Sequence, residues 1–442
     1  MTSKEHRGLA SMHTGKRNKT NIIYIAYGRG TIPFHADPAL ADWHVIRPAF
    51  APPLPHAEEA FRTACRNPIA SRPLREVIRP GDRVVIVTSD GTRPVPNHQL
   101  IPWLLQELPV PPEQVTVLLG NGSHRANTPA EIEAMFGPEV VKKVRICNHD
   151  AFDPQQNAYI GQTAEGHKAY LNKQYVEADK RIVVGFIEPH LFAGFSGGAK
   201  GIIPGVAAIE TIMHIHRFDL IAHPLSTWGT IEENPIRREI EAIVSLCPPD
   251  FMVNVTLNSA KEITAFFVGD YIVAHRAGCK RAKDEVMQPV PYTFPIVITS
   301  NSGYPLDQNL YQTVKGISAG ARITEPGGTI FIASECSDGI PDHGNFGTLM
   351  RVGASADDIL EHIVNLEQAI LDQWEAQVYA YLMQKYDIRI LSAMNPAEVK
   401  ACKLHPVDDL QSAVEEQIRT IGNRPRVAVL PDGPLTIPYV TT

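Results

Sequence analysis

The feature that most constrains this chain is the alternation of β-branched apolar runs with helical patterns along most of its length. The clearest predicted strands are Ile22–Tyr27, Arg83–Thr88, Gln114–Leu119, Lys180–Phe186, Phe251–Thr256, Ile296–Thr299, Thr329–Ala333 and Arg426–Leu430. Helical patterns lie between them at Gln99–Leu108, Pro129–Phe136, Pro235–Cys247, Tyr271–Met287 and Leu366–Lys385, the last being the longest predicted helix. Such alternation is typical of βαβ units, so we predict an α/β fold with mostly parallel sheets.

The length of the chain predicts more than one domain. Its 442 residues exceed what one ordinary core organises, because domains hold roughly 150 residues. A proline-marked joint at Met287–Pro295 separates two series of elements. We therefore predict an N-terminal α/β domain over 21–287, completed by 424–442, and a C-terminal α/β domain over 288–423. Residues 1–20 are polar, lack the apolar core of a signal peptide, and are expected to form a flexible tail.

Charge and composition exclude some classes of protein. The net charge of −7 argues against nucleic-acid binding, which relies on Lys and Arg to neutralise phosphates. No apolar run approaches the roughly 18 residues of a membrane span, so we expect no membrane association. The six cysteines are scattered, which is typical of free thiols in a reducing compartment, and we predict a cytoplasmic protein.

Polar, glycine-containing segments follow three of the predicted strands. They are Ser89–Pro94, Gly120–Arg125 and Glu188–Gly201. Ligands of open α/β sheets bind beyond the carboxyl ends of the strands. If these strands are parallel, one edge of the sheet gathers the side chains of Asp90, Arg93, His124, His190 and Lys200.

The residues at this edge suggest proton-transfer chemistry and anion binding. A lone histidine after a strand is more often structural, but two in glycine-containing loops can act as alternating general bases. The glycines around Lys200 let backbone N–H groups approach an anion, although a tight turn with a solvated lysine explains them equally well. The segment is not a P-loop, because Lys200 is preceded by Ala199 and followed by Gly201.

Two further segments carry candidate ligands. His214 and His216 form an H-x-H pattern, which lacks the third ligand of a zinc site and is commonly an ordinary surface pattern. Tyr311 and Lys315 share one face of a predicted helix, with Gln312 beside Lys315. That face can bind a carboxylate, and the alternative is a solvated helix surface.

Taken together, these strings resemble the nickel-dependent lactate racemase family. The matching pieces are SDGTRPVP (89–96), GNGSHR (120–125), IEPHLFAGFSGGAKGIIPG (187–205), His216, GYPLDQNLYQTVKG (303–316) and DQW (372–374). They occur in the family's order and span roughly residues 20 to 430. The nineteen-residue central string is the most specific of them.

The resemblance implies two α/β domains with the active site in the interdomain cleft, and a nickel-pincer nucleotide cofactor. This cofactor is a mononucleotide of the pyridinium-3-thioamide-5-thiocarboxylic acid type, derived from nicotinate. The residues that match the family's cofactor contacts are Lys200, as the covalent tether, together with Ser196, Gly197, Gly198 and Asp90. The nickel ligand matches His216, with His214 as the alternative, and the catalytic bases match His124 and His190. The substrate contacts match Arg93, Tyr311, Gln312, Lys315 and Trp374. The partners implied are a small 2-hydroxy acid and the enzymes that make the cofactor.

The implied reaction is racemisation by hydride transfer through a 2-keto acid. Removing the C2 hydrogen as a proton would place negative charge beside a carboxylate, whereas removing it as a hydride gives a neutral ketone. Two bases then serve the two enantiomers. Two alternatives remain: a family member acting on malate, a longer hydroxy acid or a sugar acid such as gluconate, and a non-catalytic protein that binds the cofactor. The sequence leaves the oligomeric state open.

Overall fold

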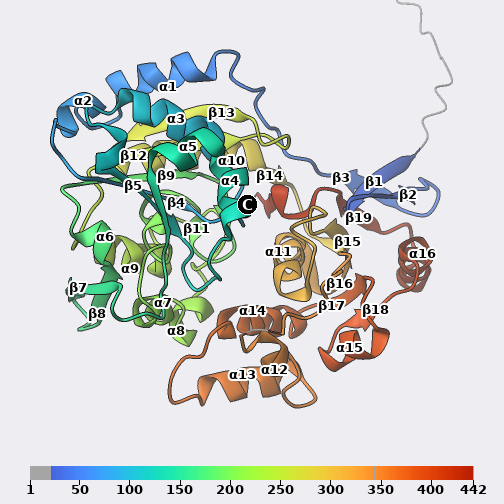
Figure 1. The fold of residues 1–442 in the computed structure, drawn as a ribbon. Helices are drawn as coiled ribbons and strands as arrows, with labels where there is room; N and C mark the ends of the chain where they lie inside the picture. Colours follow the sequence, from blue (N-terminus) through green and yellow to red (C-terminus); the bar gives the residue numbers. More distant parts are fainter. Residues whose placement is uncertain (1–20, 343, 442) are drawn as a thin grey trace, which may run out of the picture.

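The computed structural model describes residues 21–342 and 344–441, whose strands build two six-stranded sheets (Figure 1). The first sheet has the order β13-β12-β9-β4-β5-β6. Its strands are β4 (Val84–Ser89), β5 (Val115–Gly120), β6 (Arg145–Asn148), β9 (Lys180–Phe186), β12 (Phe251–Leu257) and β13 (Ile263–Gly269). Every neighbouring pair is parallel except β12 and β13. The predicted α/β class with mostly parallel sheets is confirmed.

The second sheet has the order β18-β17-β16-β15-β19-β3 and is parallel throughout. Its strands are β3 (Asp42–Val45), β15 (Phe294–Ser300), β16 (Thr324–Ala333), β17 (Asp387–Leu391), β18 (His405–Pro406) and β19 (Arg426–Leu430). The remaining strands form two-stranded sheets: β1 (Ile22–Tyr27) with β2 (Gly30–His35), β7 (Asn157–Gln162) with β8 (Lys168–Asn172), β10 (Pro189–His190) with β11 (Gly194–Phe195), and β14 (Met287–Val290) with β20 (Ile437–Val440).

Helices cover both faces of the first sheet because its strands bury side chains on both sides. In β4, Val84 and Ile86 pack into one apolar cluster, and the alternating Val85 and Val87 pack into another. The helices of the first unit are α1 (Ala57–Arg66), α2 (Leu74–Val77), α3 (Asn97–Glu107), η1 (Pro112–Gln114), α4 (Pro129–Phe136), α5 (Pro138–Lys143), α6 (Lys173–Val176), η2 (Gly198–Gly201), α7 (Ile209–Ile215), α8 (Phe218–Ala222), α9 (Pro235–Val244) and α10 (Val273–Val286).

The second sheet is also covered on both faces. Side chains of α16 and the β1–β2 hairpin pack on one face, while those of α11 and α14 pack on the other. The helices of this unit are α11 (Leu310–Ala321), α12 (Phe346–Met350), α13 (Ala356–Val364), α14 (Gln373–Met383), α15 (Pro396–Ala401), α16 (Leu410–Ile421) and η3 (Gly433–Leu435).

The assignment of residues 424–442 to the first domain is wrong for the strand that this segment contains. β19 lies in the second sheet, between β15 and β3. Its fully buried core, Val427–Leu430, fits a central strand of either sheet, and only the tertiary pairing decides between them. The first predicted strand, β1, pairs antiparallel with β2 and packs against the second sheet, and β3 is an edge strand of that sheet.

The predicted long helix Leu366–Lys385 is also wrong at its start. Helix α14 begins only at Gln373, because Asp372 adopts a left-handed conformation with φ of 68°. The Gln373 side chain accepts a hydrogen bond from the Ile370 N–H (2.8 Å), which holds the preceding segment as a loop. The proposed tail, residues 1–20, lies outside the described residues.

The two units share a continuous apolar cluster near α8 and α14. Gln377 of α14 also donates a hydrogen bond from Nε2 to the Phe218 carbonyl of α8 (2.9 Å). This contact fixes the second unit against the loops of the first.

All six cysteines are free, as predicted. Within 21–342 and 344–441, no helix has both the length and the apolar character needed to cross a membrane.

Candidate active site

Three neighbouring strands bring the sequence-predicted loops together. β9, β4 and β5 are adjacent and parallel, so the segments that follow them emerge at one edge of the sheet. Asp90 and Arg93 follow β4, His124 follows β5, and Glu188 and His190 follow β9.

A cavity of about 440 Å³ opens between this edge and the carboxyl edge of the second sheet. From the first unit it is lined by predicted residues that include Arg93, His190, Ser196, Gly197 and Lys200. The second unit contributes Lys315 from α11 and residues that follow β15 and β19, namely Ser302, Tyr304, Pro305, Leu306, Pro434 and Leu435. The other predicted residues, Asp90, His124, Gly198, His216, Tyr311, Gln312 and Trp374, do not line this cavity.

The glycine-rich segment is packed tightly against the sheet. A Cβ on Gly197 would lie 2.5 Å from Asn254 Oδ1, and Gly197 has φ of 74°. The Gly198 N–H donates to Asn254 Oδ1 (2.8 Å). The Ser196 hydroxyl donates to the Phe186 carbonyl and accepts from the Glu188 N–H, both at 2.9 Å. Internal hydrogen bonds therefore occupy Ser196 Oγ and the Gly198 N–H, and this segment's clearest role is to fix Lys200.

Lys200 presents its amine to the cavity from η2. Among the described residues, its Nζ has no hydrogen-bond or ion-pair partner. Burial lowers the pKa of Lys200 well below its ordinary range, and the charges of Arg93 and Arg237 lower it further. A lysine with a depressed pKa is partly neutral and therefore nucleophilic.

His190 is held at the cavity wall by its own loop. Its Nδ1 accepts long hydrogen bonds from the N–H groups of Phe192 (3.4 Å) and Ala193 (3.3 Å). The neutral ring consequently carries its proton on Nε2. Burial, followed by the charge of Lys200, lowers the pKa of His190 well below its ordinary value. His190 is therefore neutral at physiological pH.

His124 forms a pair with Asp90 beside the cavity. The Nδ1 atom of His124 lies 2.8 Å from Asp90 Oδ2. Burial raises the pKa of Asp90, but the hydrogen bond and charge of His124 more than offset this, and the pKa is lowered. An ionised Asp90 accepts the Nδ1 proton, so Nε2 of His124 keeps its lone pair. The His124 side chain is 46% exposed, so this lone pair is within reach of a ligand.

His216 ends helix α7 with one ring nitrogen occupied. Its Nδ1 donates to the Ile212 carbonyl (2.8 Å), which leaves Nε2 as the unprotonated nitrogen. Burial lowers the pKa of His216 to about 4. The ring packs against Trp374 at a tilt of 35°, with the ring centroids 4.3 Å apart. Trp374 Nε1 donates to the Tyr311 hydroxyl (3.1 Å). The alternative ligand His214 is engaged elsewhere, because its Nε2 lies 2.7 Å from Glu239 Oε1.

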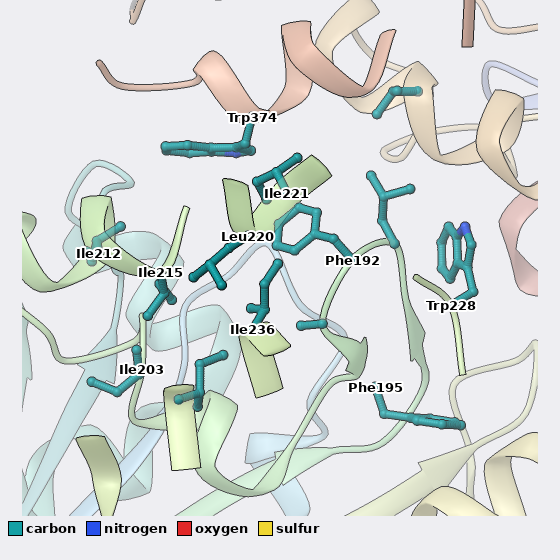
Figure 2. Close-up of a cluster of buried hydrophobic side chains, with 14 of the residues drawn as sticks. Phe192, Phe195, Ile203, Ile212, Ile215, Leu220, Ile221, Trp228, Ile236 and Trp374 are labelled. Carbon is teal, nitrogen blue, oxygen red and sulfur yellow. The ribbon is translucent and has the colours of Figure 1, made fainter. Parts of the chain in front are cut away.

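Trp374 joins the two units at this point. Figure 2 shows it extending from the upper ribbon towards an apolar cluster that contains Phe192, Leu220 and Ile221. Phe192 packs edge-on against both His190 and His216, with distances between ring centroids of 4.7 Å and 5.4 Å. The two histidine rings are thus linked through one aromatic side chain.

On the second wall, Lys315 Nζ donates to Gln312 Oε1 (2.6 Å), as their spacing predicted. Burial, followed by the nearby charge of Arg93, lowers the pKa of Lys315 to about 8. Arg93 has no side-chain partner among the described residues, so both cations are available to a carboxylate.

Three charged residues of this region were given no role from the sequence. Glu188 lines the cavity. Glu375, which follows Trp374, is buried with an unpartnered Oε2, and burial raises its pKa to about 7. Arg237 is fully buried and donates to the carbonyls of Ala193 and Phe195. For Glu188 the sequence offered two signals, its place in the string 187–205 and its position shortly after a predicted strand.

His275 supports the glycine-rich segment from below and makes stability depend on pH. Its Nε2 donates to the Ser196 carbonyl (2.8 Å), and burial and Arg237 lower its pKa well below the ordinary value. Below about pH 6.5 this histidine is therefore protonated in the unfolded chain but stays neutral in the native protein, so the free energy of unfolding decreases as pH falls.

We expect the stability advantage of wild type over His275→Gln to shrink below that pH, by at most about 1.4 kcal/mol per pH unit. Urea unfolding of both proteins at several pH values measures this, and a difference independent of pH would contradict it.

Comparisons with known proteins identify the family. The model of the lactate racemase N-terminal domain matches residues 27–229, and that of the lactate racemase C-terminal domain matches 291–437. The chain is 36% identical over 383 residues to a lactate racemase from Thermoanaerobacterium thermosaccharolyticum, covering 85% of this chain and 89% of that protein. It is 34% identical over 381 residues to a lactate racemase from Lactiplantibacillus plantarum, with the same shares covered.

A solved structure supports the same family assignment. The lactate racemase apoprotein from Thermoanaerobacterium thermosaccharolyticum superposes with a TM-score of 0.87 at 34% identity, over 95% of this chain and all of that one. A protein structure from Thermotoga maritima has a TM-score of 0.65 at 18% identity, over 87% of this chain and 98% of that one, and shares the fold. The chain belongs to the lactate racemase family of isomerases, as its sequence motifs predicted.

Proposed function

We propose that this protein racemises a small 2-hydroxy acid of the lactate type, using a nickel-pincer nucleotide attached to Lys200. The observation that carries the proposal is the unpartnered Lys200 amine in an enclosed cavity that His190 and Arg93 also line. The same cavity suits an anionic substrate, because Arg93, Lys200, Lys261 and Lys315 all line it.

The residues present fit the cofactor that the family implies. His216 offers an unprotonated Nε2 in an apolar setting, which suits a nickel ion that also has sulfur ligands. The depressed pKa of Lys200 provides a nucleophilic amine for a covalent tether. When bound, this group supplies a hydride acceptor, which the side chains of the protein lack.

The protein's own residues then bind the substrate and move its proton. Arg93 and Lys315 hold the substrate carboxylate from opposite walls of the cleft. His124 Nε2, oriented by Asp90, accepts the hydroxyl proton of one enantiomer. His190 serves the other enantiomer through its Nδ1 lone pair, which is engaged only by the long hydrogen bonds from the Phe192 and Ala193 N–H groups. Trp374, Phe192 and the cluster in Figure 2 keep water from the nickel side of the site.

The proposed function is tested by producing the protein together with enzymes that make the cofactor. The purified protein should contain about one nickel ion per chain and convert a single enantiomer of lactate to the racemate. Parallel incubations with malate, a longer 2-hydroxy acid and gluconate identify the preferred substrate. A protein loaded with nickel and cofactor that converts none of these acids would be a cofactor-binding protein, and the proposal would fail.

The two-base scheme makes a separate prediction. His124→Ala and His190→Ala should each lower kcat for lactate racemisation by about 100-fold or more, because each removes one proton-transfer group. Nickel content should remain that of the wild type, since neither ring is the proposed ligand. Racemisation that survives both substitutions would refute the assignment.

A further inference from the structure

Glu188 is a charged residue of the cavity for which the proposed mechanism has no use. Its backbone is fixed on both sides by Ser196: the Glu188 N–H donates to Ser196 Oγ (2.9 Å), and its carbonyl accepts from the Ser196 N–H (2.8 Å). Its side chain lines both the main cavity and an adjoining pocket of about 30 Å³. Among the residues that the structure describes, its carboxylate has no hydrogen-bond or ion-pair partner.

The surroundings make this lack of a partner unexpected. Burial raises the pKa of Glu188, while the charges of Arg93, Lys261 and Lys315 oppose that rise without reaching ion-pair distance. A carboxylate that faces a cavity without a partner from the protein is available to hydrogen-bond donors of a bound molecule. The backbone hydrogen bonds to Ser196 hold Glu188 at the cavity, so a bound molecule is the natural partner of its carboxylate.

The chemistry of a carboxylate limits what that partner is. Its oxygens accept hydrogen bonds and repel anions, so the carboxylate of a hydroxy acid and the phosphate of a nucleotide are both excluded. Neutral hydroxyl groups fit, as when an acidic residue binds the ribose of a dinucleotide.

We propose that the Glu188 carboxylate accepts hydrogen bonds from hydroxyl groups of the bound molecule. These belong either to the ribose of the nucleotide cofactor or to a hydroxyl of the substrate beyond the one at C2. This inference rests on the proposed function and extends it by naming a recognition residue.

The test compares Glu188→Gln and Glu188→Ala with the matched control Glu262→Gln. Glu262 is an exposed carboxylate on the β12–β13 turn that does not line the cavity. Each protein is produced with the cofactor-making enzymes, and cofactor content is measured by intact mass and nickel analysis. Next, kcat/KM is measured for lactate and for glycerate, which is lactate with one additional hydroxyl.

If the partner is the ribose, both Glu188 variants should retain about tenfold less cofactor than the control. If it is a substrate hydroxyl, cofactor content should stay constant and the glycerate-to-lactate ratio of kcat/KM should fall about tenfold. Cofactor content and ratio both within about twofold of wild type would overturn the inference. Wild-type protein that binds no nickel would instead refute the proposed function, so the two failures are distinguishable.

Discussion

Replacing Lys200 with alanine is expected to abolish cofactor attachment and to lower racemase activity by at least about 1,000-fold. The reason is that Lys200 provides an unpartnered amine at the cavity, and its depressed pKa makes this amine nucleophilic. Lys200→Arg should fail equally, because a guanidinium keeps the positive charge but is not nucleophilic at neutral pH. Intact mass and peptide mapping of protein made with the cofactor enzymes measure the loss of the adduct.

The control for this experiment is Lys283→Ala. Lys283 is an exposed lysine on α10 and does not line the cavity, so its variant should carry the adduct and racemise normally. An undiminished adduct mass on the Lys200→Ala protein would show that the tether lies elsewhere.

Gly194→Ala is expected to destabilise the fold by about 3–5 kcal/mol, the second large effect. Gly194 has φ of 77°, and a Cβ there would lie only 1.9 Å from the Thr230 carbonyl oxygen. Since that oxygen belongs to the backbone, relief of the clash must move the segment between His190 and Lys200 or the loop that contains Thr230. Activity should therefore fall even in the folded fraction.

Gly327 is a closely matched control. It has φ of 78°, but nothing lies within 4 Å of the position its Cβ would take. Gly327→Ala should cost only the left-handed backbone penalty of about 1–2 kcal/mol. Urea unfolding of both variants separates the clash from the backbone strain, and equal losses of stability would contradict the proposed role of close packing at Gly194.

The local parts of the fold were predictable from the sequence because they depend on short-range patterns. The strands β4, β5 and β9 each contain a short run rich in β-branched apolar residues, and α4 begins at a capping box formed by Thr128 and Glu131. Pairing partners were not predictable, since β19 fits a central position in either sheet. The start of α14 depends on the left-handed Asp372, which no periodicity reveals.

The candidate site, like the fold, was predictable from the sequence only in part. Motifs located Arg93, His190, Lys200 and Lys315, and the structure places all four at one cavity. Glu188, Glu375 and Arg237 were missed, because burial and missing or unusual partners distinguish them. These properties exist only once both units are assembled.

The central claim is that the cavity at Lys200 racemises a 2-hydroxy acid by moving the C2 hydrogen as a hydride. The most direct measurement follows that hydrogen with lactate of one configuration, deuterated at C2, in ordinary water with cofactor-loaded protein. We predict that the opposite enantiomer forms with most of its deuterium retained, because a hydride held in an enclosed site does not exchange with solvent. Product in which solvent hydrogen has replaced the deuterium would indicate proton abstraction and contradict the account.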